Sequence, residues 1–126
     1  MGTDIDGWIE CRRRLIDEET WEAVMKLGFV YFGRDYNAFG QLFGVRNTKS
    51  TQSIAAKRGL PDDVSPPVKE EARGAGLFAH SWISWQELQQ SNWKGDTHWQ
   101  ALRKILEVFA GLYGDENVRL VVWFED

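Results

Sequence analysis

Three arginines in the middle of the chain have the chemistry to bind an anion together. Arg34 precedes an expected short helix, Arg46 follows it, and Arg58 lies in a turn marked by glycine and proline. A guanidinium group pairs through two parallel hydrogen bonds with phosphate or carboxylate oxygens. If the three converge, they form an anion clamp on which Tyr36 or Trp82 stacks a base. The alternative is three separate surface or ion-paired arginines.

A histidine beside a serine offers acid–base chemistry. His80 precedes Ser81, and Asp4 or Asp6 would be its partner in a hydrolase or transferase acting on a phosphorylated or nucleotide substrate. A structural hydrogen bond is the commoner role for such a histidine. His98 is expected on the surface, at the start of a long helix. His80 and Asp4 are therefore catalytic candidates without a complete motif around them.

Carboxylates alternate along the first expected strand. Asp4, Asp6 and Glu10 share one side of it and are weak candidates for a divalent cation, because hard cations prefer several oxygen ligands. A solvated strand face is the favoured interpretation. Cys11 is expected to face inward, and a single cysteine excludes an intramolecular disulfide or a cysteine-rich zinc site. We expect no bound metal or cofactor.

Three tryptophans, Trp82, Trp85 and Trp93, lie close together in the sequence. They suit a stacking platform for a base, an anchor for a protein interface, or the core, and we expect at least one in the core. The sequence contains no glycine-rich phosphate loop, no Gly-x-Ser-x-Gly motif and no His-Glu-x-x-His motif. Its chemistry therefore points to binding more than to a known reaction.

Size and composition narrow the class of protein. The chain has 126 residues, which suits a single domain spanning residues 1–126, and 43% of them are hydrophobic. A net charge of −4 argues against direct binding to nucleic acid. No apolar run approaches the roughly 20 residues of a membrane helix, and no signal peptide is recognisable. We expect a cytoplasmic protein without a membrane partner.

Periodicity predicts the elements that must position these groups. The alternation at residues 5–11 predicts a strand, residues 18–27 fit either a helix or a strand, and residues 35–43 predict a helix that ends at Gly44. A polar loop is expected at residues 47–53. Ser65 and Pro66 then suit the start of a short helix that ends at Gly74 or Gly76.

The second half of the chain gives the clearest signals. Ser84 and Glu87 have the spacing of a capping box, and residues 97–113 carry an apolar stripe that Leu112 would widen. Residues 118–125 read as a buried strand. The fold class is therefore α+β. It has a small antiparallel sheet that includes the N- and C-terminal strands, packed by the long C-terminal helix and several short helices.

Several blocks of the sequence resemble a family of phage and bacterial proteins whose activity is uncharacterised. The chain opens on Met-Gly-Thr-Asp-Ile-Asp, which resembles the family's Met-Gly-Cys-Asp-Ile-His opening, and contains Arg-Gly-Leu-Pro-Asp-Asp-Val-Ser at residues 58–65. Further similar blocks are Arg-Asp-Tyr at residues 34–36 with Phe39, Gly-Val-Arg-Asn at 44–47, His-Ser-Trp at 80–82, Glu-Leu at 87–88 and the strand at 118–124. The resemblance implies a phage-type accessory protein.

The chain departs from that family's pattern at three positions. Thr3 stands where the family usually has cysteine, Asp6 stands where it has histidine, and Phe78 stands about where it often has a second histidine. If relatives use those groups for metal binding or catalysis, this chain has lost part of the site. The groups of the pattern that remain suit the binding of an anionic ligand better than metal chemistry. They are Asp4, Arg34, Tyr36, Arg46, Arg58 and His80.

The leading hypothesis is an accessory binding protein that acts in counter-defence. It would either sequester a nucleotide-like signal or block a host defence protein such as a CRISPR effector, in the manner of an anti-CRISPR protein. One alternative is the small enzyme that uses His80 and Asp4. Another is a structural or assembly protein, for which a homo-oligomer would be expected.

Overall fold

A four-stranded antiparallel sheet forms the centre of the protein, in a computed structural model that describes residues 2–13, 20–31, 33–47, 52–91 and 95–126. The strands are β1 (Asp4–Arg12), β2 (Trp21–Lys26), β3 (Phe78–Ser84) and β4 (Val118–Glu125), in the order β2-β1-β4-β3. The two terminal strands pair in the middle of the sheet, with Asp4 opposite Glu125 and Cys11 opposite Val118. The predicted α+β class and central pairing are confirmed.

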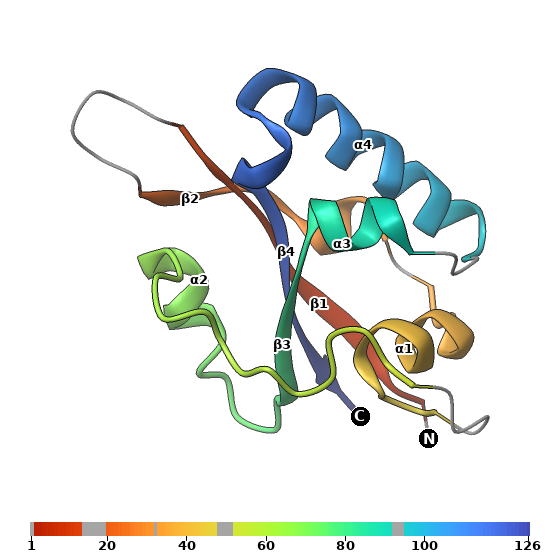
Figure 1. The fold of residues 1–126 in the computed structure, drawn as a ribbon. Helices are drawn as coiled ribbons and strands as arrows, with labels where there is room; N and C mark the ends of the chain where they lie inside the picture. Colours follow the sequence, from red (N-terminus) through yellow and green to blue (C-terminus); the bar gives the residue numbers. More distant parts are fainter. Residues whose placement is uncertain (1, 14–19, 32, 48–51, 92–94) are drawn as a thin grey trace.

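Helices cover both faces of this sheet (Figure 1). The helices are α1 (Tyr36–Phe43), α2 (Pro66–Glu71), α3 (Trp85–Gln90) and α4 (Thr97–Tyr113), with short 3₁₀ turns η1 (Leu27–Phe29) and η2 (Asp115–Asn117). The main apolar core joins one face to α1, α3 and α4, whereas α2 packs on the other face. In β4, Leu120 and Val122 enter the main core while Val121 and Trp123 enter the second cluster, so this strand is buried on both sides.

Local signals account for the helices. The Asp35 side chain accepts a hydrogen bond from the Ala38 amide at the start of α1, and Gly44 ends that helix in the left-handed conformation. The predicted capping box is present at Ser84 and Glu87. The long helix has the predicted bounds, but Leu112 is 68% exposed and does not widen its buried stripe. The helix at Pro66 ends at Glu71, before the predicted glycines.

Two strands differ from the sequence expectation. The ambiguous segment forms the strand β2 where it is described, and residues 14–19 lie outside the described part of the chain, as do residues 48–51 of the expected loop. β3 was not predicted at all. Its register with β4 shifts between Phe78 and Ser81, where Ala79 has a φ of 54°, so the alternation that would announce a strand is broken.

The far end of the polar side of β1 is not solvated, which corrects the favoured interpretation for Glu10, whereas Asp4 and Asp6 at the start of the strand remain in contact with solvent. Glu10 is 0% exposed, and its carboxylate accepts hydrogen bonds from Arg119 Nε at 2.7 Å and from the Ser65 amide at 2.8 Å. Arg119 also donates to Asp63 Oδ1 at 2.8 Å, and its guanidinium lies 3.9 Å from the centre of the Trp21 ring. A buried ion pair therefore links the two central strands to the segment that precedes α2.

Removing one member of this pair should strongly destabilise the fold. In an Arg119→Ala variant Glu10 stays buried without its counter-charge, so we expect the free energy of unfolding to fall by about 3–5 kcal/mol. Urea unfolding followed by tryptophan fluorescence measures it. The control is Arg13→Ala, because Arg13 and its partner Glu22 are both 54% exposed, and such a surface pair contributes about 0–1 kcal/mol. Equal stability of the two variants would contradict the assignment.

Candidate functional site

The start of β1 and the two ends of α1 bring two predicted binding residues, Tyr36 and Arg46, together around Thr3. The Thr3 amide donates a hydrogen bond to the Tyr36 hydroxyl at 3.0 Å, and Arg46 Nε donates to the Thr3 hydroxyl at 2.8 Å. The Arg46 guanidinium lies 5.0 Å from the centre of the Tyr36 ring. Because Tyr36 begins the helix and Arg46 follows its glycine cap, α1 holds both side chains beside Thr3.

Arg34 reaches the same end of the sheet but is paired there. Its Nε donates to Asp4 Oδ1 at 2.7 Å, and the hydrogen bond from Arg34 lowers the pKa of the Asp4 carboxyl below its usual value. The two side chains are 53% and 63% exposed. An exposed pair of this kind adds little stability, so Arg34 remains accessible to solvent at the edge of the site.

A cavity of about 420 Å³ opens beside Arg46, and we call it the Arg46–Lys57 pocket. Its lining consists of Thr3, Gly44, Val45, Arg46, Lys57, Phe78, Ala79 and Asp126. Arg46 and Lys57 bring positive charge, and Phe78 is 37% exposed. Thr3 is 1% exposed, and its hydroxyl accepts the hydrogen bond from Arg46. The Asp126 carboxylate at the rim accepts a hydrogen bond from that hydroxyl at 2.7 Å.

Backbone strain collects around this pocket. In the described part of the chain, the residues other than glycine with positive φ are Arg46 at 54°, Lys57 at 51° and Ala79 at 54°, and all three line it. Such residues are uncommon, and conformations of this kind gather at ligand sites and switch regions because the surrounding structure must hold them. The Arg46–Lys57 pocket is therefore the strongest candidate for a binding site.

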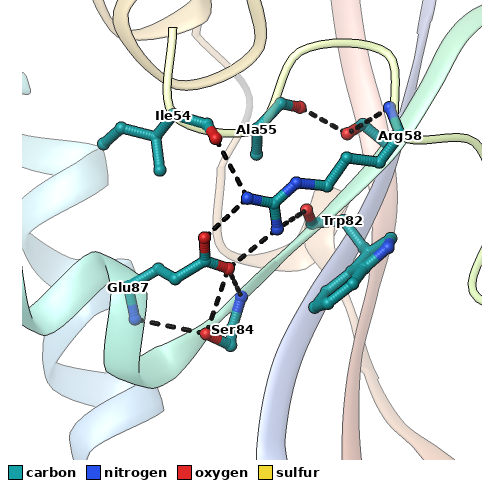
Figure 2. A network of polar contacts seen from close by, with 7 residues as sticks. Ile54, Ala55, Arg58, Trp82, Ser84 and Glu87 are labelled. Atoms are coloured by element: carbon teal, nitrogen blue, oxygen red, sulfur yellow. Dashed lines mark hydrogen bonds and ion pairs between the residues drawn. The ribbon is translucent and has the colours of Figure 1, made fainter.

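Arg58 does not join this cluster, because internal groups take up its guanidinium (Figure 2). Its two terminal nitrogens donate to the Glu87 carboxylate at 2.8 Å and 2.6 Å, and also to the carbonyls of Trp82 and Ile54. The guanidinium lies 4.8 Å from the centre of the Trp82 ring. Arg58 and Trp82 therefore tie the segment before Gly59 to β3 and α3, and the three arginines do not form one clamp.

The pair of catalytic candidates is not assembled either. His80 Nε2 donates to the Ala72 carbonyl at 2.8 Å, and its ring lies against Trp123 at 6.2 Å between centroids. Asp4 lies on β1, with β4 between it and β3. Neighbouring strands are about 4.8 Å apart, so two strand spacings already place the backbones roughly 10 Å from each other. His80 has the structural hydrogen bond that was its alternative role.

The candidate metal ligands each have another partner. Asp4 pairs with Arg34, Asp6 with Lys26 at 3.0 Å, and Glu10 with Arg119. Among the described residues, no group of three or more histidine, cysteine or acidic side chains is placed to hold a metal ion. Of the three tryptophans, Trp85 is in the core, Trp82 stacks on Arg58, and Trp93 lies outside the described residues.

Sequence reasoning missed Lys57 as a site residue. Thr3 and Phe78 were noted only as departures from the resembling family, yet both line the Arg46–Lys57 pocket. Lys57 and Phe78 are 21 positions apart in the sequence, and the irregular backbone at Ala79 helps to place them together. No periodic pattern in the sequence predicts that Lys57 and Phe78 line the same pocket. The sequence held one usable signal for Thr3 and Phe78: these two departures from the family pattern lie close in the sequence to the candidate residues Asp4 and His80.

Cys11 should be chemically inert while the protein is folded. Burial, followed by the charges of Glu10 and Glu22, raises the pKa of its thiol to about 12, and the side chain is 2% exposed. The thiolate is the reactive form, so we expect slow labelling by a disulfide reagent at pH 8 and fast labelling in denaturant. Fast, stoichiometric labelling of the folded protein would contradict this environment.

The pair of Arg58 and Glu87 predicts a dependence of stability on pH. The hydrogen bond from Arg58 lowers the pKa of Glu87 despite the opposing effect of burial. The stabilisation is therefore full above the unfolded pKa and is lost as the pH falls through the folded one. We expect Glu87→Gln to cost about 2 kcal/mol at pH 7. That difference should shrink in acid, as measured by urea unfolding at several pH values, and a pH-independent difference would contradict the pair's role.

Comparison with known proteins gives no relative: no family model, no curated protein and no solved structure matches the chain. The resemblance to phage and bacterial proteins therefore stays a prediction. None of the helices in the described ranges is both long and apolar enough to cross a membrane. What the protein does must be argued from its own geometry.

Proposed function

We propose that the protein is a binding protein for a small anionic ligand of nucleotide-like chemistry, held in the Arg46–Lys57 pocket. The observation that carries the proposal is that the three described residues other than glycine with strained backbones line the same cavity, and two of them are cations. Strained conformations cluster at ligand sites, which is why their gathering around one cavity supports a binding role for it.

The chemistry of the lining favours an anion that carries a ring. Lys57 is exposed and makes no ion pair or hydrogen bond with any residue the structure describes, so its charge is available. Arg46 is oriented by the Tyr36 ring and the Thr3 hydroxyl, which fixes the direction of its donors. Phosphate would pair with these cations, while the exposed face of Phe78 would stack on a base. The cavity volume lies within the usual range for small-molecule sites.

The proposed role is sequestration without turnover. His80 and Asp4 lie on separate strands with other partners, so these two candidates do not form an acid–base pair beside the pocket. In the phage setting that the sequence resemblance implies, removing a nucleotide-like signal would act in counter-defence. Thr3 and Phe78 occupy positions where that family carries cysteine and histidine, which fits a site whose chemistry varies between relatives.

The test is binding by the purified chain and two charge-removing variants. Native mass spectrometry of protein taken directly from cells looks for a small co-purifying mass, and calorimetry then titrates mono-, di- and cyclic nucleotides and inorganic phosphate. We expect Lys57→Gln and Arg46→Gln each to weaken binding at least about tenfold, roughly 1.4 kcal/mol. Binding should also weaken with added salt, because the cations are exposed.

Arg34→Gln is the matched control. Arg34 is an exposed arginine at the same end of the sheet, but it is paired with Asp4 and does not line the pocket, so its loss should leave affinity nearly unchanged. Melting temperatures of all variants verify that they fold. Failure of every probe to bind, or equal binding by the Lys57→Gln variant, would sink the proposal. A host protein attached in the mass spectrum would favour the protein-blocking hypothesis in its place.

A further inference from the structure

The Arg46–Lys57 pocket contains a carboxylate as well as its two cations. Asp126 directly follows β4 and lines the pocket together with Arg46 and Lys57. Its Oδ1 accepts a hydrogen bond from the Thr3 hydroxyl at 2.7 Å, and that hydroxyl accepts one from Arg46 Nε at 2.8 Å. Only two hydrogen bonds therefore separate the carboxylate from the guanidinium, and the buried Thr3 side chain orients both groups.

The second oxygen of this carboxylate is available to a ligand. Asp126 is exposed, and its Oδ2 accepts no hydrogen bond from any residue that the structure describes. A negative charge in this pocket weakens the binding of a simple anion, because like charges repel each other. It favours only a ligand that carries hydrogen-bond donors next to its anionic group. The proposed ligand should therefore present O–H or N–H groups to Asp126.

The order of groups in a nucleotide indicates which donors these are. In a nucleoside 5′-phosphate the ribose lies between the phosphate and the base, so the ribose hydroxyls are nearer to the phosphate than the donors on the base edge. A phosphate bound by Arg46 would thus place the ribose beside the Asp126 carboxylate. An aspartate or glutamate accepts a hydrogen bond from a ribose hydroxyl in this way in dinucleotide-binding folds.

The sheet arranges the lining residues in a matching order. Thr3 precedes β1, Asp126 follows β4 and Phe78 begins β3, and these strands are neighbours in the order β1-β4-β3. Phe78 pairs with Phe124, with 6.3 Å between their ring centroids. Asp126 is two positions beyond Phe124, so it shares that face of the sheet. Diagonal neighbours of this kind are about 7–8 Å apart, which puts Phe78 within reach of a base when Asp126 contacts the ribose.

We propose that Asp126 binds the ribose hydroxyls of the ligand and makes the pocket selective for ribonucleotides that carry a 5′-phosphate. This inference rests on the proposed function, because it concerns the same pocket and the same kind of ligand. It adds the sugar to the chemistry that the pocket recognises. It also assigns Asp126 as a residue that determines specificity, whereas Arg46 and Lys57 attract the phosphate.

Calorimetry tests this selectivity with the common ribonucleoside 5′-monophosphates, their 2′,3′-dideoxy counterparts and inorganic phosphate. For every base that binds, we expect the dideoxy form to bind about tenfold more weakly than the ribonucleotide, because its hydrogen bonds to a charged group are lost. Inorganic phosphate should bind more weakly still, since it offers the cations nothing to offset the repulsion by Asp126.

An Asp126→Asn variant separates recognition from a structural role. It should lower the affinity for ribonucleotides to nearly that for the dideoxy forms, so that the two losses do not add. The same variant should tighten the binding of inorganic phosphate, because the repelling charge is gone. A purely structural role of Asp126 would instead weaken the binding of all three kinds of ligand together.

Glu125→Gln is the matched control. It removes the same charge at the neighbouring exposed position, which does not line the pocket, so the preference for ribonucleotides should be unchanged. Equal affinity for ribonucleotides and dideoxy forms would overturn this inference and leave the proposed function standing. An Asp126→Asn variant with the original preference would do the same. If no nucleotide and no phosphate binds, the proposed function fails, and this inference fails with it.

Discussion

The pairing of Glu10 with Arg119 joins the two central strands on the face that α2 covers. Glu10 is fully buried, and its second oxygen accepts the Ser65 amide, so one carboxylate fixes both a neighbouring strand and the start of the covering helix. A charge in this position is expensive unless it is paired and hydrogen-bonded. The second layer of the protein therefore depends on a polar contact as much as on the small apolar cluster of Val68, Ala72 and Trp123.

The same central strands also decide where the candidate site lies. Because the terminal strands pair from Asp4 opposite Glu125 to Cys11 opposite Val118, Thr3 and Asp126 meet at one end of the sheet. Arg46, which follows the C-terminal cap of α1, reaches the same end. The bulge in β3 brings Phe78 and Ala79 to that end as well. A pocket assembled from five separate segments can be held firmly enough to keep its strained residues in place.

Much of this fold was predictable because its signals are local. The Gly44 cap, the capping box at Ser84 and Glu87 and most of the α4 stripe lie within single segments and appear as expected. Leu112 stays outside the buried stripe, and the helix at Pro66 ends earlier than expected, at Glu71. β3 was missed because its bulge breaks the alternation, and the burial of Glu10 was missed because a strand pattern does not tell whether a second layer covers its polar side. The same distinction between local and distant contacts applies to the site. The closeness of Tyr36 and Arg46 was predictable because they lie at the two ends of one helix, whereas the pairing of Arg58 with Glu87 was not, because Glu87 lies 29 positions away.

Arginines stacked on aromatic rings recur through the structure, and their different partners separate scaffold from site. Arg119 lies on Trp21 and Arg58 on Trp82, and in both cases carboxylates of the chain occupy the guanidinium. Stacking on a ring fixes the orientation of the planar guanidinium group, and its parallel N–H donors are then well placed to bind an oxyanion. Arg46 lies on Tyr36 in the same manner, and it lines a cavity shared with Lys57, which makes no ion pair with any described residue. Under the proposed function, this end of the sheet would use for an external anion the same kind of stacked arginine that elsewhere holds the fold together.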